Sequence, residues 1–139
     1  MILRSDVLFR SGFPDDTLGD HHGIVVWPGR NITEALKAAL ERLGYRVSEP
    51  ICAEHAGWEL DVWRQRKSLS LRVTVVDANE CYLMAKSSSW LWRENRLLRM
   101  FLTDLQRILD EDGRFKVIGW FPGGGSAGTM MSWRSPFAP

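Results

Sequence analysis

Two strand-like runs between Gly57 and Val76 constrain what this chain can fold into more than any other segment. Apolar and polar side chains alternate along each run, and a period of two is the pattern of a strand with one buried and one open face. A basic stretch at 64–67 separates the runs and supplies a turn. The side chains expected to point into the core are Trp58, Leu60, Val62, Leu69, Leu71, Val73 and Val75. The segment therefore predicts an antiparallel hairpin that needs a second layer to cover its apolar face.

Two helical segments are long enough to supply that layer. In the first, Asn31 and Glu34 have the spacing of a capping box, an apolar stripe follows, and Gly44 is placed to end the helix. The second is predicted from about Trp90 to Asp112. Further strands are predicted at 45–51, 81–86 and 115–121, with a short one at 24–27. The order helix, four strands, helix, strand predicts an α+β two-layer sandwich, a mainly antiparallel sheet with both helices on one face.

The chain is most simply one domain, because 139 residues suffice to bury a core without disulfides. Glycine, proline and aspartate interrupt residues 1–23, which are expected to form an irregular N-terminal arm. The predicted α+β domain spans residues 24–121. Gly123–Gly125 then opens a glycine-rich linker and a C-terminal tail over 122–139, which is expected either to fray or to dock by its apolar side chains.

Composition argues against two classes of partner. The formal net charge is +1, which is too small for the broad basic surface of a general nucleic-acid binder. No apolar run approaches the length of a membrane span, and Met1–Arg10 lacks the apolar core of a signal peptide. Cys52 and Cys81 are expected to be reduced and buried, so we expect a cytoplasmic protein. An exposed strand edge near Pro50, or a free sheet face, would suit a homodimer.

The outward face of the predicted hairpin carries the main candidate binding residues. Glu59 and Asp61 lie two positions apart, so their carboxylates project on the same side as the ring of Trp63. Arg72 belongs to the facing strand. An aromatic ring among charges is typical of a recognition surface. The alternative is an ordinary solvated sheet face in which Arg72 pairs with a carboxylate across the strands.

The long helix adds two candidates. Arg93 and Arg96 crowd its start, and the acidic run Asp110–Asp112 crowds its end. Both biases oppose the helix dipole, which favours anions at the start and cations at the end. A partner of complementary charge would account for this arrangement, and so would pairing inside the fold, such as Arg107 with Glu111. The predicted partner-binding residues are Glu59, Asp61, Trp63, Arg72, Arg93 and Arg96.

The sequence supports an enzymatic function less well than a binding function, and no catalytic residue, metal or cofactor is predicted. Acid–base work by Glu59 and Asp61 would also need burial and a third convergent group. A metal-dependent hydrolase that uses Glu59, Asp61 and His55 is the alternative, and it rests on their proximity along the chain. His21 and His22 are adjacent, and successive side chains of an extended chain diverge, so both are expected to be surface residues.

Several of these segments together resemble a group of known proteins. The run from Trp27 through Arg30, the helix before Gly44 and Tyr45, the stretch from Gly57 to Leu60, and the pair Trp120 and Phe121 resembles a group of small, uncharacterised bacterial α+β proteins. Several such domains are similar to immunity proteins encoded beside polymorphic secreted toxins. The resemblance covers residues 24–121 and brings no catalytic residues with it. It implies a non-enzymatic protein-binding module, an immunity protein that neutralises a cognate toxin, with a secretion chaperone as a further alternative.

Overall fold

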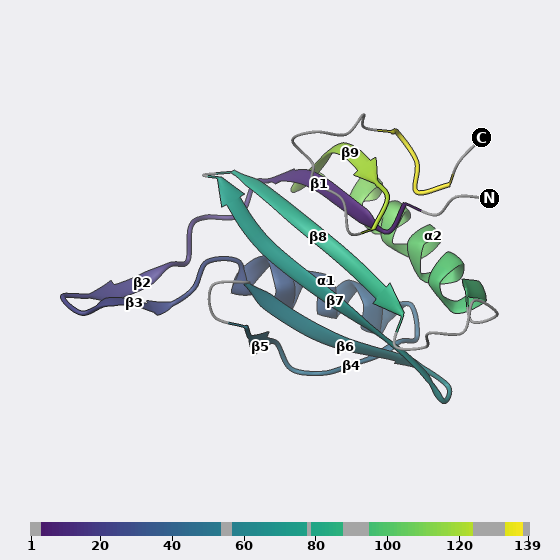
Figure 1. Ribbon diagram of the computed structural model, residues 1–139, viewed down its shortest axis with the longest axis horizontal. Helices are drawn as coiled ribbons and strands as arrows, with labels where there is room; N and C mark the ends of the chain where they lie inside the picture. Colours follow the sequence, from purple (N-terminus) through teal and green to yellow (C-terminus); the bar gives the residue numbers. More distant parts are fainter. Residues whose placement is uncertain (1–3, 54–56, 78, 88–94, 124–132, 138–139) are drawn as a thin grey trace.

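A curved antiparallel sheet forms the body of the protein in a computed structural model that describes residues 4–53, 57–77, 79–87, 95–123 and 133–137 (Figure 1). The strands are β1 (Asp6–Ser11), β2 (Leu18–Asp20), β3 (Gly23–Val26), β4 (Arg46–Val47), β5 (Ile51–Cys52), β6 (Trp58–Arg64), β7 (Lys67–Asp77), β8 (Glu80–Ser87) and β9 (Phe115–Phe121). The helices are α1 (Arg30–Arg42) and α2 (Asn95–Glu111). The main sheet has the order β4-β6-β7-β8-β1-β9. Strand β5 also pairs with β6, along the same edge as β4 but nearer the start of β6. Strands β2 and β3 form a separate two-stranded ribbon.

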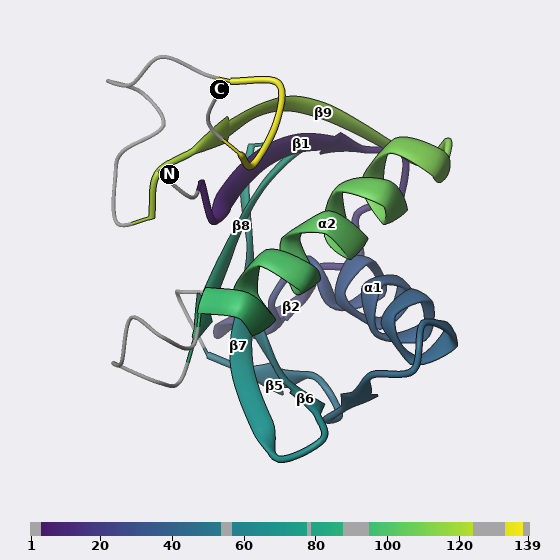
Figure 2. The same cartoon turned by 90° about the vertical axis from the view of Figure 1, so that its right-hand side faces the viewer.

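Both helices cover the same face of the sheet, on the inside of its curve (Figure 2). Helix α1 packs against β4 and β6, α2 packs against β8 and β9, and the two helices touch each other. The structure therefore confirms the predicted α+β two-layer sandwich. The hairpin of β6 and β7 supplies the centre of the core: Leu60, Leu71 and Val73 are completely buried, and Leu60 lies directly opposite Leu71. Its two-residue turn, at Gln65 and Arg66, falls inside the predicted stretch.

The prediction of an irregular arm over residues 1–23 is wrong for Asp6–Ser11, which form strand β1. Strand β1 lies inside the sheet, antiparallel to β8 on one side and to β9 on the other. Val7 and Phe9 are completely buried. Glycine and proline punctuate the chain only after Ser11, so they end this strand rather than prevent it. The domain therefore includes residues well before position 24.

Helix α1 begins by a different device from the predicted capping box. Gly29, with φ of 103°, is the residue before its first turn, and Asn31 already lies within the helix. The carboxylate of Asp16 accepts hydrogen bonds from the backbone N–H groups of Gly29 (2.9 Å) and Asn31 (2.8 Å). Glu34 pairs with Arg30 on the helix surface instead of reaching back. The predicted end is confirmed, because the helix stops at Arg42 and Gly44 follows with φ of 94°.

The described part of the C-terminal tail docks on its own domain. Trp133 and Trp120 exchange two backbone hydrogen bonds across the free edge of β9. The backbone N–H of Arg4 donates to the carbonyl of Pro136 (2.8 Å), and the Arg4 guanidinium lies 4.2 Å from the centre of the Trp133 ring. Residues 133–137 therefore pack against the domain, as the docking alternative expects, and join the two chain ends beside β1 and β9 (Figure 1).

Candidate functional site

The face of the sheet turned away from the helices is polar along its three longest strands. We call this surface the open face, and it consists of Glu59, Asp61, Trp63, Ser68, Ser70, Arg72, Thr74, Tyr82, Met84 and Lys86. The register aligns these residues in rows across the strands, with Glu59, Arg72 and Met84 in one row and Asp61, Ser70 and Lys86 in the next. Four predicted binding residues, Glu59, Asp61, Trp63 and Arg72, thus share one surface.

Arg72 and Glu59 form the central ion pair of the open face. The Nε and Nη2 atoms of Arg72 both donate to Oε1 of Glu59, at 2.9 and 2.5 Å. Both side chains are partly exposed, at 43% and 33%. The cross-strand pairing expected of an ordinary solvated face is therefore present. It also restrains the arginine, whose side chain stays partly exposed and keeps further N–H donors beyond the two that bind Glu59.

Trp63 and Asp61 extend the open face towards the β4 edge. The Arg46 guanidinium of β4 lies 5.1 Å from the centre of the Trp63 ring, within reach of a cation–π contact. Ser48 fixes the backbone of Asp61, because its Oγ accepts from the Asp61 N–H at 2.9 Å. No hydrogen bond or ion pair joins the Asp61 carboxylate to any other residue that the structure describes. Asp61 is therefore a partly exposed charge with a defined position and spare hydrogen-bonding capacity.

A groove of about 450 Å³ lies on the open face, between its central strands and the chain near Ser5 and Gly123. Its polar wall includes Glu59, Ser70, Arg72 and Lys86, with Met84 as an apolar patch. Asp6, almost completely buried, borders the groove and accepts a hydrogen bond from the Tyr82 hydroxyl at 2.8 Å. Burial and this bond raise the pKa of Tyr82, so the hydroxyl stays a donor at neutral pH. The groove offers both charge signs and an apolar contact within one depression.

The structure does not place the two predicted helix arginines, Arg93 and Arg96, together on the open face. Arg93 lies outside the described residues, as does the predicted helix start at Trp90, and Arg96 is exposed on the first turn of α2. The acidic end of the helix has partners inside the fold. Glu111 faces Arg107 at 4.0 Å, and Asp112 binds Arg114 at 2.8 Å. Pairing within the fold therefore accounts for Glu111 and Asp112, two of the three acidic residues at this end.

The described residues do not show the arrangement that a metal-dependent hydrolase of Glu59, Asp61 and His55 would need. Glu59 and Asp61 share a face as predicted, but the Glu59 carboxylate already binds Arg72. His55 lies outside the described residues. Within the ranges that the structure describes, no three histidine, cysteine, aspartate or glutamate side chains gather as a metal would require. The two carboxylates are partly exposed on the sheet surface, and one of them is already paired.

The two cysteines differ in a way that chemistry can test. Cys52 is exposed, contrary to prediction, because β5 is a two-residue strand at the sheet edge, whereas Cys81 is buried. Burial raises the pKa of the Cys81 thiol to about 12, and the charge of Asp16 adds to the effect. Since the thiolate is the reactive form, Ellman's reagent should modify one thiol per native chain rapidly and the second only after unfolding. Cys52→Ser should abolish the rapid phase, and a rapid phase that survives in this variant would contradict the assignment.

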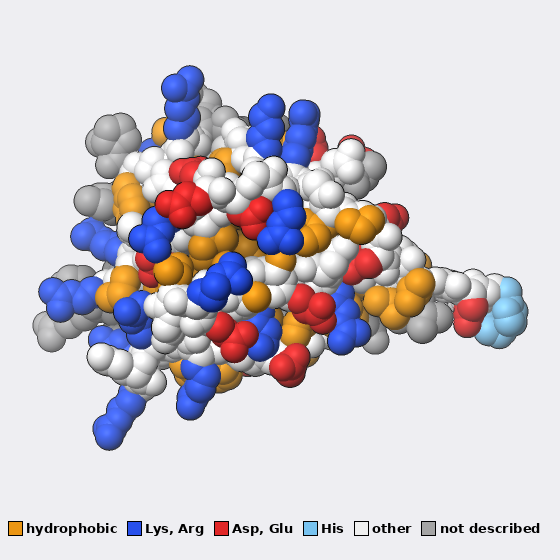
Figure 3. Space-filling model, turned by 180° about the vertical axis from the view of Figure 1, so that it is seen from behind, with side chains coloured by type: hydrophobic (Ala, Val, Ile, Leu, Met, Phe, Trp, Pro, Cys, Tyr) orange, Lys and Arg blue, Asp and Glu red, His pale blue; other side chains and the backbone are white. Residues whose placement is uncertain are grey.

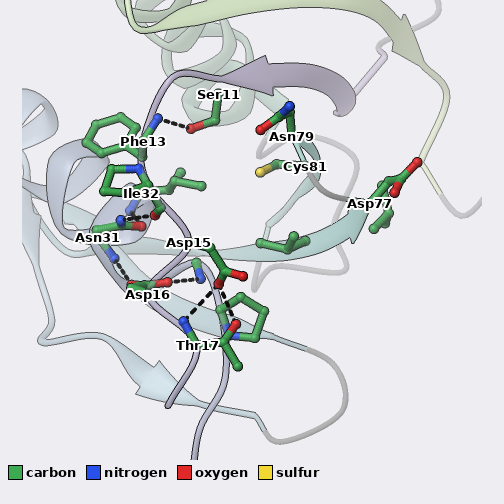
Figure 4. Close-up of a pocket in the computed structure, with 15 residues that line it drawn as sticks. Ser11, Phe13, Asp15, Asp16, Thr17, Asn31, Ile32, Asp77, Asn79 and Cys81 are labelled. Carbon is green, nitrogen blue, oxygen red and sulfur yellow. Dashed lines mark hydrogen bonds between the residues drawn. The ribbon is translucent and has the colours of Figure 1, made fainter. Parts of the chain in front are cut away.

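Sequence reasoning missed a second surface, at the start of α1. Asp15, Asp16 and Asp77 line a pocket of about 220 Å³ there, with the sulfur of Cys81 among its walls (Figure 4). The nearby ribbon holds His21 and His22 at its tip, where their ring centroids are 3.9 Å apart. The prediction that both histidines are surface residues is confirmed, since they are exposed in the turn between β2 and β3, where the chain is not extended and the rings lie close together. The sequence signals of this ribbon are the apolar run at 24–26 and the turn-forming residues Asp20 and Gly23 on either side of the histidines.

Neither described helix combines the length and apolar character that crossing a membrane requires. Comparison of the chain with protein-family models, curated proteins and solved structures found no match.

Proposed function

We propose that this chain is a non-enzymatic protein-binding module, and specifically a cytoplasmic immunity protein that binds and neutralises a cognate bacterial toxin. The observation that carries the proposal is the open face itself. Both helices pack on the other side of the sheet, and β6, β7 and β8 present an ordered array of charged, aromatic and hydroxyl side chains to solvent.

The composition of the open face fits a protein partner. Tryptophan, tyrosine and arginine are the residues most often found at the energetic centre of protein interfaces, and Trp63, Tyr82 and Arg72 all lie on this face. The backbone of three paired strands holds them, so little conformational entropy is lost when a partner binds. Charges of both signs at fixed positions favour one complementary partner over others.

The test is calorimetric titration of the purified chain with the product of the adjacent gene. We expect tight binding that weakens about tenfold or more when Trp63 becomes alanine, because removing an anchoring aromatic side chain costs about 2 kcal/mol. Asp61→Ala and Glu59→Ala should weaken binding by smaller factors. The Glu59 variant also frees Arg72, which that carboxylate holds in place.

Glu41→Ala is the matched control. Glu41 also forms an ion pair, with Lys37, but it lies on α1 and therefore on the helix side of the molecule. This variant should bind like the original chain. Absence of binding to every neighbouring gene product would overturn the immunity assignment, and a secretion-system effector as the partner would replace it with the chaperone alternative. Equal losses for Glu41→Ala and Glu59→Ala would remove the open face as the contact surface.

A further inference from the structure

The ribbon of β2 and β3 projects from one end of the main sheet and forms a separate two-stranded sheet (Figure 1). Two of its apolar side chains are open to solvent, with Leu18 61% and Ile24 47% exposed. A two-stranded ribbon alone is marginally stable in water, and apolar surface that gathers at one place often marks an interaction site. The ribbon therefore presents apolar surface that its own fold does not cover.

An apolar hollow continues this surface onto the body of the protein. The hollow measures about 150 Å³, and its walls include Ile24, Trp27, Pro28 and Val75. Val76, on the adjoining strand β7, is 54% exposed. In the view from behind, hydrophobic side chains are visible where the ribbon leaves the body, with the two histidines at its tip (Figure 3). Ile24 joins the ribbon to the hollow, because it is exposed on the ribbon and also forms part of the hollow's wall.

The acidic pocket at the start of α1 adjoins this hollow, because Thr17, Pro28 and Val75 line both. Among the described residues, its walls carry three aspartates and no lysine or arginine. Hydrogen bonds from Thr17 lower the pKa of Asp15 and keep its carboxylate charged. At about 220 Å³ the pocket is smaller than the 300 Å³ or so that small-molecule sites usually need, so it suits a single side chain.

We propose that this end of the molecule docks a segment of a partner protein that carries an arginine or lysine beside a bulky apolar residue. The cationic side chain enters the pocket of Asp15, Asp16 and Asp77, and the apolar side chain packs against Ile24 in the hollow. A second copy of this chain is the poorer occupant, since a two-fold interface would bring the same aspartates of both copies together. The site goes beyond the proposed function and does not depend on the open face.

Panning a random peptide library on the immobilised whole chain tests this inference, followed by fluorescence titration of the leading synthetic peptide. The enriched peptides should carry arginine or lysine next to leucine, isoleucine, phenylalanine or tryptophan. Ile24→Ser should raise the Kd of the leading peptide about tenfold, because burial of that side chain is lost. Asp15→Asn should raise the Kd strongly at low salt and little at high salt.

Two matched variants serve as controls. Ile118→Ser removes an apolar side chain that is 40% exposed on β9, and Asp110→Asn removes an exposed carboxylate on α2. Both should leave the Kd unchanged, as should Glu59→Ala, which separates this site from the open face. Failure to enrich any peptide, enrichment of acidic peptides, or an unchanged Kd in Ile24→Ser would overturn the inference. A dimer in sedimentation that Ile24→Ser converts to monomer would overturn it as well, in favour of the second copy.

Discussion

Replacing Gly57 with alanine is expected to lower the free energy of unfolding by about 3 kcal/mol or more. Gly57 has φ of 96°, where residues with a Cβ are strained. A Cβ at this position would lie 2.1 Å from the backbone oxygen of Val73 in the neighbouring strand. That oxygen belongs to the sheet and not to a flexible side chain, so the start of β6 has to move away from β7. Urea unfolding followed by circular dichroism measures the loss.

Two other glycines separate the components of this effect. Gly44 also has positive φ, of 94°, but a Cβ there would meet nothing within 4 Å, so Gly44→Ala reports backbone strain alone, about 1–2 kcal/mol. At Gly113 a Cβ meets nothing either and no positive φ is involved, so Gly113→Ala should stay within about 0.5 kcal/mol. A Gly57 variant no less stable than the Gly44 variant would contradict the close packing of β6 on β7.

The elements predicted correctly are those that the residues within and directly beside them determine. The β6–β7 hairpin follows from alternation and from the turn between Arg64 and Lys67, and these fix the register that places Glu59 opposite Arg72. Strand β9 matches its predicted span, Phe115–Phe121. In each case the period of the apolar residues and the neighbouring turn residues suffice, since no distant part of the chain has to be known.

The missed elements depend on partners far along the chain. Asp6 opens β1 as a charged residue in a buried position, tolerated because the Tyr82 hydroxyl donates to it from β8. Asp16 caps α1 from a loop well before the helix, whereas capping patterns in sequence search only the adjacent residues. Neither contact leaves a local signature, so both the N-terminal strand and the acidic pocket beside α1 escape sequence reasoning.

Part of the candidate site can likewise be predicted from local sequence, and part depends on distant pairing. Glu59, Asp61 and Trp63 share a face because strand alternation requires it, and the sequence is enough to predict that. The groove beside them also needs Ser5 and Gly123, which reach it only through the pairing of β1 with β8 and β9. The surface around Leu18 and Ile24 likewise depends on where the ribbon leaves the body.

Replacing Phe9 with alanine is expected to lower the free energy of unfolding by about 3–5 kcal/mol. Phe9 is completely buried in the middle of β1, between Cys81 of β8 and Val117 of β9. Its ring meets that of Phe115 edge to face, with centroids 5.4 Å apart. The substitution leaves a cavity where three strands meet and removes an aromatic pair. Thermal and urea unfolding measure a loss that is a large share of the 5–15 kcal/mol typical of whole domains.

Leu18→Ala is the matched control for Phe9→Ala. Leu18 also falls within residues 1–23, but its side chain is 61% exposed on the ribbon, so its removal should change stability by about 0.5 kcal/mol or less. If residues 1–23 were an irregular arm throughout, the two variants would unfold alike. A large difference between them is expected because β1 is a strand of the central sheet and the ribbon is not. Equal stability of the two variants would remove β1 from the core.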